Sequence, residues 1–326
     1  MNVADWWEDL ASASLDDCAD AGLINHTWLV GTPPRFVVQR VNPMFGPAVH
    51  DDIEAVTAHL AANGLTTPRL LRTDAGALCA LAEDGAAWRV LTFVPGVTVH
   101  TMDGPARARS AGALVARFHR TVDDLRWDYR HVRPGSHDTV RHMERLEGAV
   151  RSGPALPVAE GILDLWSSWS GRLDLPLRHA HGDLKLSNLR FDHEGTGVCL
   201  VDLDTLGLQP IDVELGDAWR SWCNPVGEDG VDTRLDLELL GAAIAGYREE
   251  RLLGTEEAEG LVGAVERISL ELAARFCRDV VEDCYFGWNA KRFGSRAEHN
   301  LHRAIGQLNL ARSARAQRGS IARLLA

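Results

Sequence analysis

The chain has 326 residues, of which 45% are hydrophobic and 25% are charged, which is typical of a globular protein with a full core. This length suits two domains or one bilobal unit. The formal net charge of −12 and the isoelectric point of about 5.5 argue against nucleic acids and anionic membranes as partners, because an acidic surface repels both.

The six cysteines form no Cys-x-x-Cys pair and lie mostly in apolar or helical stretches. This pattern predicts reduced thiols and a cytoplasmic protein. The acidic N-terminus lacks the basic and apolar regions of a signal peptide, and no apolar stretch approaches the length of a membrane span.

Strand patterns dominate the first third of the chain. Residues 5–20 predict a short acidic helix, and residues 22–30 and 36–41 predict two strands close enough for an antiparallel hairpin. Apolar residues at helical spacing predict a helix over 51–62, with Asp51 or Asp52 as its N-cap and Asn63-Gly64 as its stop. Strands are expected near 69–71, 78–82 and 87–93, so this part should be a small sheet carrying one helix.

Helical patterns dominate after Pro95-Gly96, where we place the boundary between an N-terminal lobe of residues 1–95 and a C-terminal lobe of residues 96–326. Residues 111–118 carry an amphipathic stripe, and residues 131–158 predict an irregular insertion flanking a helix. Further helices are expected over 160–173, 235–253, 256–285 and 297–316. A strand-rich third before a helix-rich remainder predicts an α+β protein in two lobes.

One stretch carries most of the chemical information. Residues 181–188 read His-Gly-Asp-Leu-Lys-Leu-Ser-Asn, which places Asn188 five residues after Asp183. Asp202 ends a short apolar run nineteen positions after Asp183. Kinase chemistry uses such parts: one carboxylate for the proton of the acceptor hydroxyl, and an amide oxygen and a second carboxylate for Mg²⁺. Chance would have to produce three coincident spacings to imitate this pattern.

With these motifs the chain resembles the kinase-like phosphotransferases, which include aminoglycoside phosphotransferases, choline kinases and small-sugar kinases. The resemblance implies a bilobal, protein-kinase-like fold that uses ATP and Mg²⁺, with a nucleotide-binding first lobe and a second lobe for catalysis and acceptor binding. It assigns Asp183 as the catalytic base and Asn188 and Asp202 as Mg²⁺ ligands. Asp204, two residues on along a strand end, could share a face with Asp202, either as a ligand or in a supporting role. Lys185 could stabilise charge on the transferring phosphoryl group, or be a surface lysine.

The nucleotide-binding residues depart from the usual kinase pattern. No Gly-x-Gly-x-x-Gly occurs, so the phosphate cradle falls on backbone amides of the 22–27 turn, with Gly22 and Asn25. Arg40 stands where the resemblance leads us to expect a strand lysine, and its acidic partner on the 51–62 helix is expected to be Asp52, with Asp51 and Glu54 as alternatives. The adenine should meet backbone groups between Thr92 and Val94.

The favoured acceptor is a small hydroxylated molecule, a sugar or amino sugar ahead of an aminoglycoside, choline or homoserine. The narrower likeness is to the N-acetylhexosamine 1-kinase branch, through the segments at 22–27, 38–42, 56–60, 201–205 and 215–220. Trp219, Trp222 and Trp288 are candidates to face a sugar ring. Asp217 is expected to be structural. The choice between ATP and GTP, the hydroxyl that is phosphorylated and the oligomeric state stay open.

Three rival interpretations remain. A protein kinase is disfavoured because only fourteen residues separate Asp202 from Asp217, which leaves little room for an activation loop. A nucleotide-binding pseudokinase would require the loss of Asp183, Asn188 or Asp202, and all three are present. A generic α+β binding protein is favoured only if the motif is a coincidence.

Overall fold

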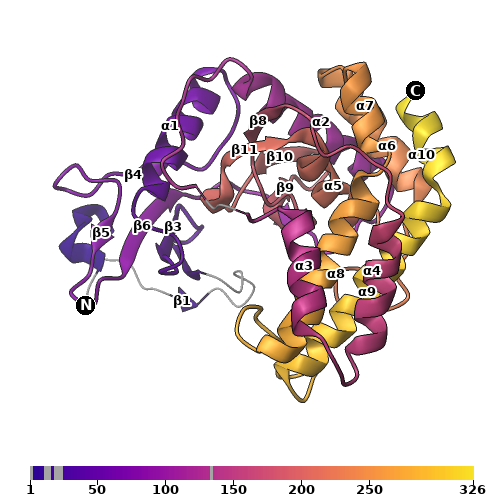
Figure 1. The fold of residues 1–326 in the computed structure, drawn as a ribbon. Coiled ribbons are helices and arrows are strands. Elements are labelled where there is room, and N and C mark those ends of the chain that lie inside the picture. Colours follow the sequence, from indigo (N-terminus) through magenta and orange to yellow (C-terminus); the bar gives the residue numbers. More distant parts are fainter. Residues whose placement is uncertain (1–2, 11–15, 18–24, 133–134) are drawn as a thin grey trace.

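The computed structural model describes residues 3–10, 16–17, 25–132 and 135–326. Its N-terminal part is an antiparallel sheet with one helix, and its remainder is mainly helical (Figure 1). Within the described residues the sheet order is β1-β2-β3-β6-β4, and β5 also pairs with β6. The strands are β1 (Asp16–Asp17), β2 (His26–Val30), β3 (Phe36–Arg40), β4 (Leu70–Leu71), β5 (Ala80–Leu81) and β6 (Ala87–Thr92).

The hairpin expected from residues 22–41 is confirmed, since β2 pairs antiparallel with β3. Helix α1 (Val49–Ala62) covers one face of the sheet and ends at Asn63, as expected. It begins earlier than the sequence suggested, after Ala48, so neither Asp51 nor Asp52 is its N-cap. The opposite face packs against residues 3–10, which form the short 3-10 turns η1 (Val3–Asp5) and η2 (Glu8–Leu10).

The helix predicted over residues 5–20 is wrong where the structure describes it. Residues 8–10 form a single short turn and Asp16–Asp17 pair with β2 as a strand. Residues 11–15 and 18–20 lie outside the described residues. The acidic composition that suggested a helix carries no continuous apolar stripe, and pairing with β2 offers this segment a sheet edge instead.

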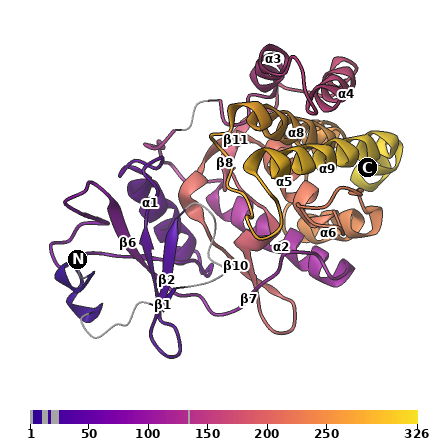
Figure 2. The same cartoon turned by 90° about the horizontal axis from the view of Figure 1, so that it is seen from below.

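Two of the longer helices in the C-terminal part are α2 (Pro105–Val122) and α8 (Ala264–Glu282) (Figure 2). The other helices are α3 (Thr139–Ala149), α4 (Leu156–Ser167), α5 (Ile211–Trp222), α6 (Leu237–Glu250), α7 (Thr255–Leu261), α9 (Arg296–Ala316) and α10 (Arg318–Leu325). The helix expected over 256–285 is two helices, divided at Val262-Gly263. The helix expected over 160–173 begins earlier and ends at Ser167.

Short strands bring the motif residues together between these helices. Strand β8 (Leu177–Ala180) pairs with β11 (Gly207–Pro210), and β9 (Leu189–Phe191) pairs with β10 (Gly197–Leu200). Strand β7 (Val97–Thr98), just after Pro95-Gly96, pairs with β9 and so links the first sheet to this region. The largest apolar core runs without interruption from α1 through α2 to α5 and α6.

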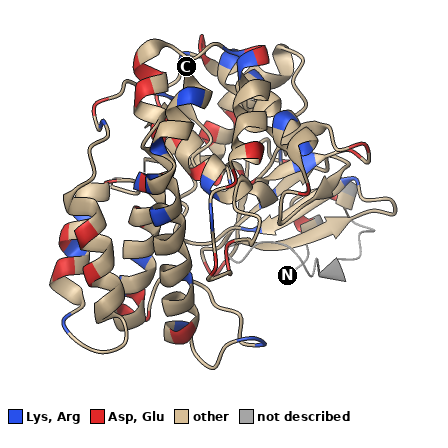
Figure 3. Cartoon of the chain, turned by 90° about the vertical axis from the view of Figure 1, so that its right-hand side faces the viewer, with Lys and Arg blue, Asp and Glu red and all other residues tan. Residues whose placement is uncertain are grey.

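Charged residues of both signs are interspersed along the helices (Figure 3). None of the helices in the described ranges is long and apolar enough to cross a membrane. Of the five cysteines that the structure describes, all are free thiols, and Cys199, Cys223 and Cys277 are buried in the core.

Candidate active site

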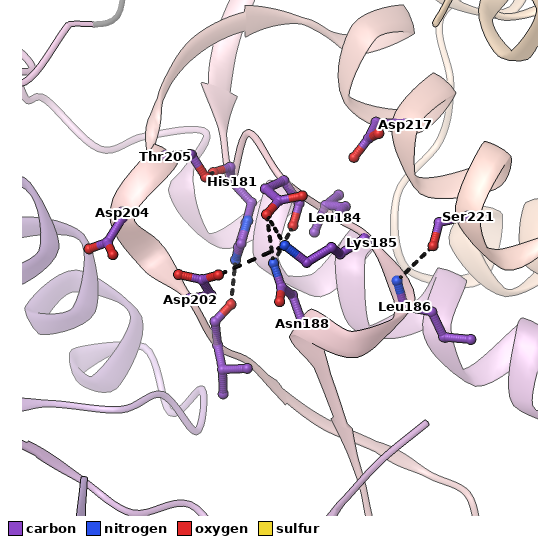
Figure 4. A network of polar contacts seen from close by, with 12 residues as sticks. His181, Leu184, Lys185, Leu186, Asn188, Asp202, Asp204, Thr205, Asp217 and Ser221 are labelled. Carbon is purple, nitrogen blue, oxygen red and sulfur yellow. Dashed lines mark hydrogen bonds and ion pairs between the residues drawn. The ribbon is translucent and has the colours of Figure 1, made fainter. Parts of the chain in front are cut away.

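Three polar side chains of the loop between β8 and β9 converge beside Asp202 (Figure 4). The Lys185 ammonium donates to the Asp183 carboxylate at 2.6 Å, and the Asn188 amide nitrogen donates to the carbonyl and the carboxylate of Asp183 at 2.9 and 3.1 Å. Lys185 Nζ lies 4.0 Å from Asp202 Oδ2. The structure thus brings together Asp183, Lys185, Asn188 and Asp202, as the spacing suggested.

Helix α5 holds this loop from behind. Glu214 accepts the backbone N–H groups of His181 and Gly182 at 2.7 and 3.0 Å, and the Trp222 indole donates to the Leu184 carbonyl at 2.8 Å. Buried carboxylates and indoles keep their positions only when such partners are present. The loop is therefore fixed by contacts that do not involve its reactive side chains.

The loop also packs tightly against the turn that follows Asp202. His181 is fully buried with its Nε2 3.0 Å from the Val201 carbonyl, and the Thr205 hydroxyl donates to the His181 carbonyl at 2.8 Å. Gly182 has φ +82°, and a side chain there would collide with the Thr205 carbonyl. Only glycine suits this position.

The charges of the site are unequal. Burial raises the pKa of Asp183, but the adjacent Lys185 ammonium outweighs it and holds this pKa below its usual range. The pKa of Asp202 is raised by burial and by the Asp204 and Asp183 carboxylates, which Lys185 offsets only in part. Asp183 is thus ionised at neutral pH, whereas the positive charge near Asp202 does not outweigh its burial and the neighbouring carboxylates.

A divalent cation fits this donor set. Asp202 contributes a carboxylate, and the bonds from Asn188 use its amide nitrogen, which leaves its amide oxygen as a ligand. Over the described part of the chain, no three His, Cys, Asp or Glu side chains are grouped to hold a metal by themselves. Mg²⁺ suits a site with so few protein ligands, because it keeps several waters and binds substrate phosphates.

Asp204 points away from this cluster (Figure 4). Its carboxylate is paired with the Arg89 guanidinium and accepts a hydrogen bond from the Asn25 amide at 2.7 Å. The expectation that Asp202 and Asp204 share one face is therefore wrong. Asp202 adopts a left-handed conformation with φ +64°, and the 3-10 turn η4 (Leu203–Thr205) that follows breaks the strand alternation on which the expectation rested.

Arg40 lies on the other face of the sheet. It pairs with Asp84 at 3.0 Å, both side chains about half exposed. Its neighbour Gln39 lies on the opposite face of the sheet and accepts a hydrogen bond from Arg89 Nε at 2.8 Å. Arg89 on β6 is the cross-strand partner of Gln39, so its guanidinium lies on the same face of the sheet as Gln39.

The expected pair of Arg40 with Asp52 does not form. Asp52 is buried and accepts three hydrogen bonds from the segment after α2: from the Trp127 indole at 2.8 Å and from the amides of Arg130 and His131 at 2.9 and 2.8 Å. Asp52 therefore ties α1 to the C-terminal part. Its position three residues into the helix, pointing toward that segment, prevents it from reaching β3.

The remaining described nucleotide candidates lie at or just beyond the ends of β2 and β6. Asn25 directly precedes β2, and Thr92 ends β6, where its amide donates to the Arg69 carbonyl at 2.9 Å. The Val94 carbonyl accepts from Arg190 at 3.3 Å. Gly22 lies outside the described residues.

Two residues with clear structural roles at this site were missed by sequence reasoning. Glu214 lies just before the 215–220 segment that carries the family resemblance, so only Asp217 of the two acids was considered. Arg89 lies in a strand that is buried at most positions, and its alignment opposite Gln39 in the β3–β6 pair would have been the usable signal.

The chain combines a small antiparallel sheet and its one helix with a helical part that carries the loop of Asp183, Lys185 and Asn188. This combination defines a phosphotransferase of the protein-kinase-like type. The chain belongs to the phosphotransferase enzyme family, whose model matches residues 19–253, more than half of the chain. The resemblance stated from the motifs is thereby confirmed at the level of the family.

Solved structures with the same fold support the bilobal α+β assignment. The GDP complex of aminoglycoside 2'-phosphotransferase-IIIa is 13% identical, with a TM-score of 0.66 over 94% of this chain and 96% of that one. A microcompartment-associated aminopropanol kinase is 17% identical, with a TM-score of 0.64 over 97% of each chain. Amicoumacin kinase hAmiN, in complex with AMP-PNP, Ca²⁺ and Ami, is 14% identical, with a TM-score of 0.60 over 90% of this chain and 87% of that one.

Proposed function

We propose that this protein is a kinase that moves the γ-phosphoryl group of ATP to a hydroxyl of a small molecule, with a sugar or amino sugar as the favoured acceptor. The observation that carries the proposal is the cluster of Asp183, Lys185, Asn188 and Asp202. Family membership supports the reaction class. The nucleotide and metal in related structures support the cofactors.

The roles follow from the charges. Asp183, ionised at neutral pH, accepts the proton of the attacking hydroxyl or orients that hydroxyl, and Lys185 beside it stabilises negative charge on the transferring group. Asn188 and Asp202 hold Mg²⁺, which when bound neutralises phosphate charge. Val94 offers its backbone to the adenine, whereas the Thr92 amide is already bonded to the Arg69 carbonyl.

The acceptor preference is supported by a carboxylate and guanidinium pair on α5. Asp217 accepts both of its bonds from Arg220 on one oxygen, at 3.1 and 2.7 Å, and the Asp183 carboxylate acts on it electrostatically. The second oxygen of Asp217 is left to accept from a sugar hydroxyl, whereas Arg220 is only 4% exposed and is bonded to both Asp217 and Glu228. Trp219 and Trp222 cannot stack on a ring as expected, because their exposed fractions are 1% and 0%.

A panel of acceptors tests the function. ATP consumption is measured with monosaccharides, amino sugars, aminoglycosides and amino alcohols, for the wild type and for Asp183→Asn. We expect one acceptor class to stimulate turnover, and Asp183→Asn to reduce that turnover by at least about a hundredfold while Mg·ATP still binds. If no acceptor stimulates turnover and Mg·ATP does not bind, the kinase proposal is wrong. Full turnover by Asp183→Asn would remove Asp183 as the base.

A further inference from the structure

Asp204 has a carboxylate that is already fully engaged. Both guanidinium nitrogens of Arg89 contact it, Nη1 on Oδ1 and Nη2 on Oδ2 at 2.9 Å, and Asn25 Nδ2 donates to Oδ2 at 2.7 Å. The Arg89 and Asp204 side chains are only 2% and 1% exposed. A carboxylate with a bidentate guanidinium and a third donor has its charge balanced within the protein. We refer to Asn25, Arg89 and Asp204 as the Asp204 anchor.

The Asp204 anchor joins the two lobes. Asn25 precedes β2, and its side-chain oxygen accepts the amide of Asn42, just beyond β3, at 2.8 Å. Arg89 on β6 donates through Nε to Gln39 on β3 at 2.8 Å. Three strands of the first sheet are therefore connected through side chains to a residue that follows β10 in the C-terminal part.

The position of Asp202 depends on this connection. Asp202 has φ +64° and ψ +62°, a left-handed conformation that is unfavourable for a residue other than glycine and that persists where surrounding contacts impose it. One residue, Leu203, separates it from Asp204, and Leu203 is buried. On the far side of the turn, Thr205 donates to His181. With Asp204 and Thr205 both held, the Asp202 carboxylate is directed toward Lys185 and Asn188.

Stability alone is a weak reason for this arrangement. A buried ion pair loses much of its attraction to the cost of removing both ions from water, and apolar residues of similar volume often fold equally well. A buried pair does, however, fix a unique geometry. The geometry fixed here is that of Asp204, and Asp202 lies two positions before it in the chain.

We propose that Arg89 and Asn25 are positioning residues for the metal site: they act through Asp204 to aim the Asp202 carboxylate, and Asp204 itself is not a metal ligand. The inference rests on the proposed function, since it assumes that Asp202 holds the metal of a nucleotide complex. Residues that orient a metal ligand typically change metal affinity by about 10- to 100-fold when they are replaced.

Binding of Mg·AMP-PNP, measured by titration calorimetry without any acceptor, tests the proposal. The variants are Arg89→Gln, Asp204→Asn and the double variant, and Arg40→Gln is the matched control because Arg40 lies on the opposite face of β3 and pairs with exposed Asp84. We expect both single variants to bind Mg·AMP-PNP about tenfold more weakly than the wild type does. In EDTA, where no Mg²⁺ is available, both should bind AMP-PNP as tightly as the wild type does. The double variant should be no weaker than either single one, and Arg40→Gln should match the wild type.

The direction of the Arg89→Gln effect separates the two roles of Asp204. If Asp204 were a metal ligand, release from Arg89 would strengthen Mg·AMP-PNP binding while Asp204→Asn weakened it, and that outcome overturns the proposal. Unchanged binding by Arg89→Gln overturns it too. Should Arg89→Gln fail to fold, Arg89→Lys keeps the charge without the bidentate contact and must still show weaker metal-dependent binding. A wild type that binds neither form of the nucleotide refutes the kinase function itself.

Discussion

Two buried glutamates organise the C-terminal part, and each is kept ionised by its neighbours. Burial would raise the pKa of Glu214, but the hydrogen bond and charge of His119, together with His181, lower it. Glu271, 1% exposed, accepts from the Thr139 hydroxyl at 2.6 Å and pairs with His137 at 3.0 Å. Its contacts join α8 to the start of α3. Neither glutamate takes part in the proposed chemistry, yet both hold elements on which it depends.

Glu271 should make the stability of the protein depend on pH. Burial favours its neutral form, but the charges of His137 and Arg275 and the bonds from His137 and Thr139 lower its pKa from 4.5 to about 2. Because the folded pKa lies below the unfolded one, its stabilisation is complete above about pH 4.5 and disappears as the pH falls toward 2. Glu271→Gln should lower the free energy of unfolding by about 2–3 kcal/mol at pH 7.

Urea unfolding of wild type and Glu271→Gln at several pH values between 7 and 3 checks this. The difference between the two proteins should shrink as the pH falls below 4.5. A difference that stays constant over this range would mean that the glutamate stabilises the fold by packing or neutral hydrogen bonds and not by its charge.

Single residues mark the limit of what the sequence could predict. The spacing of Asp183, Asn188 and Asp202 is local, so it predicted their convergence well. Arg40 was chosen by its type alone, yet side chains alternate along a strand, and Gln39 rather than Arg40 faces the cleft. Arg89 lies on another strand, forty-nine positions after Arg40, and only the pairing of β3 with β6 shows that it lies beside Gln39. Such a partner has no fixed spacing in the sequence.

At the scale of elements, the close crossing of α2 and α6 depends on two glycines. A side chain at Gly112 would collide with the Ala243 carbonyl, and one at Gly246 with the Arg109 carbonyl. The two helix backbones therefore approach each other at both points. This contact secures α2, which continues into the segment that Asp52 binds.

Replacing Gly112 with alanine should destabilise the protein by about 1–3 kcal/mol, because the added methyl group forces the helices apart. Gly148→Ala, at an exposed position of α3, is the matched control: nothing lies within 4 Å of the added methyl, and alanine in a helix is better than glycine by about 0.5–1 kcal/mol. Thermal unfolding should show changes of opposite sign. Two changes of the same sign would show that helix propensity, and not the crossing, decides the effect at Gly112.

Helices were predicted better than their ends. The stripe at 111–118 and the pattern at 297–316 gave α2 and α9, because apolar periodicity over several turns reflects burial directly. The ends depend on single contacts. Asp52 looks like an N-cap in the sequence, but its carboxylate is occupied by the segment after α2. The break between α7 and α8 falls at Gly263, next to the Trp169 ring, a contact that no local pattern announces.

At the scale of the whole molecule, the two lobes are joined at two buried carboxylates on opposite sides of the cleft. Asp204 of the C-terminal part reaches into the first sheet, and Asp52 of α1 reaches into the segment at 127–131. Helix α1 is therefore held by the second lobe through Asp52 as well as by the sheet whose face it covers. The family model and the motifs predicted two lobes, but not that their connection runs through these acids, since both pairings join residues far apart in the chain.

Asp52 should consequently matter to the whole molecule, and its neighbour Asp51 should not. Asp52→Asn replaces an oxygen acceptor by a donor that faces three N–H groups, so we expect a loss of about 2–4 kcal/mol in the free energy of unfolding, as for a broken buried network. Asp51 is the matched control, because it pairs with Arg130 at the surface, where 40% and 59% of the two side chains are exposed. Asp51→Asn should change the free energy of unfolding by no more than about 0.5 kcal/mol.

Hydrogen exchange distinguishes a local from a global effect: the amides of α1 and of residues 127–131 should lose protection together in Asp52→Asn. Loss of protection in α1 alone would mean that the helix is held by the sheet and that Asp52 does not join the lobes.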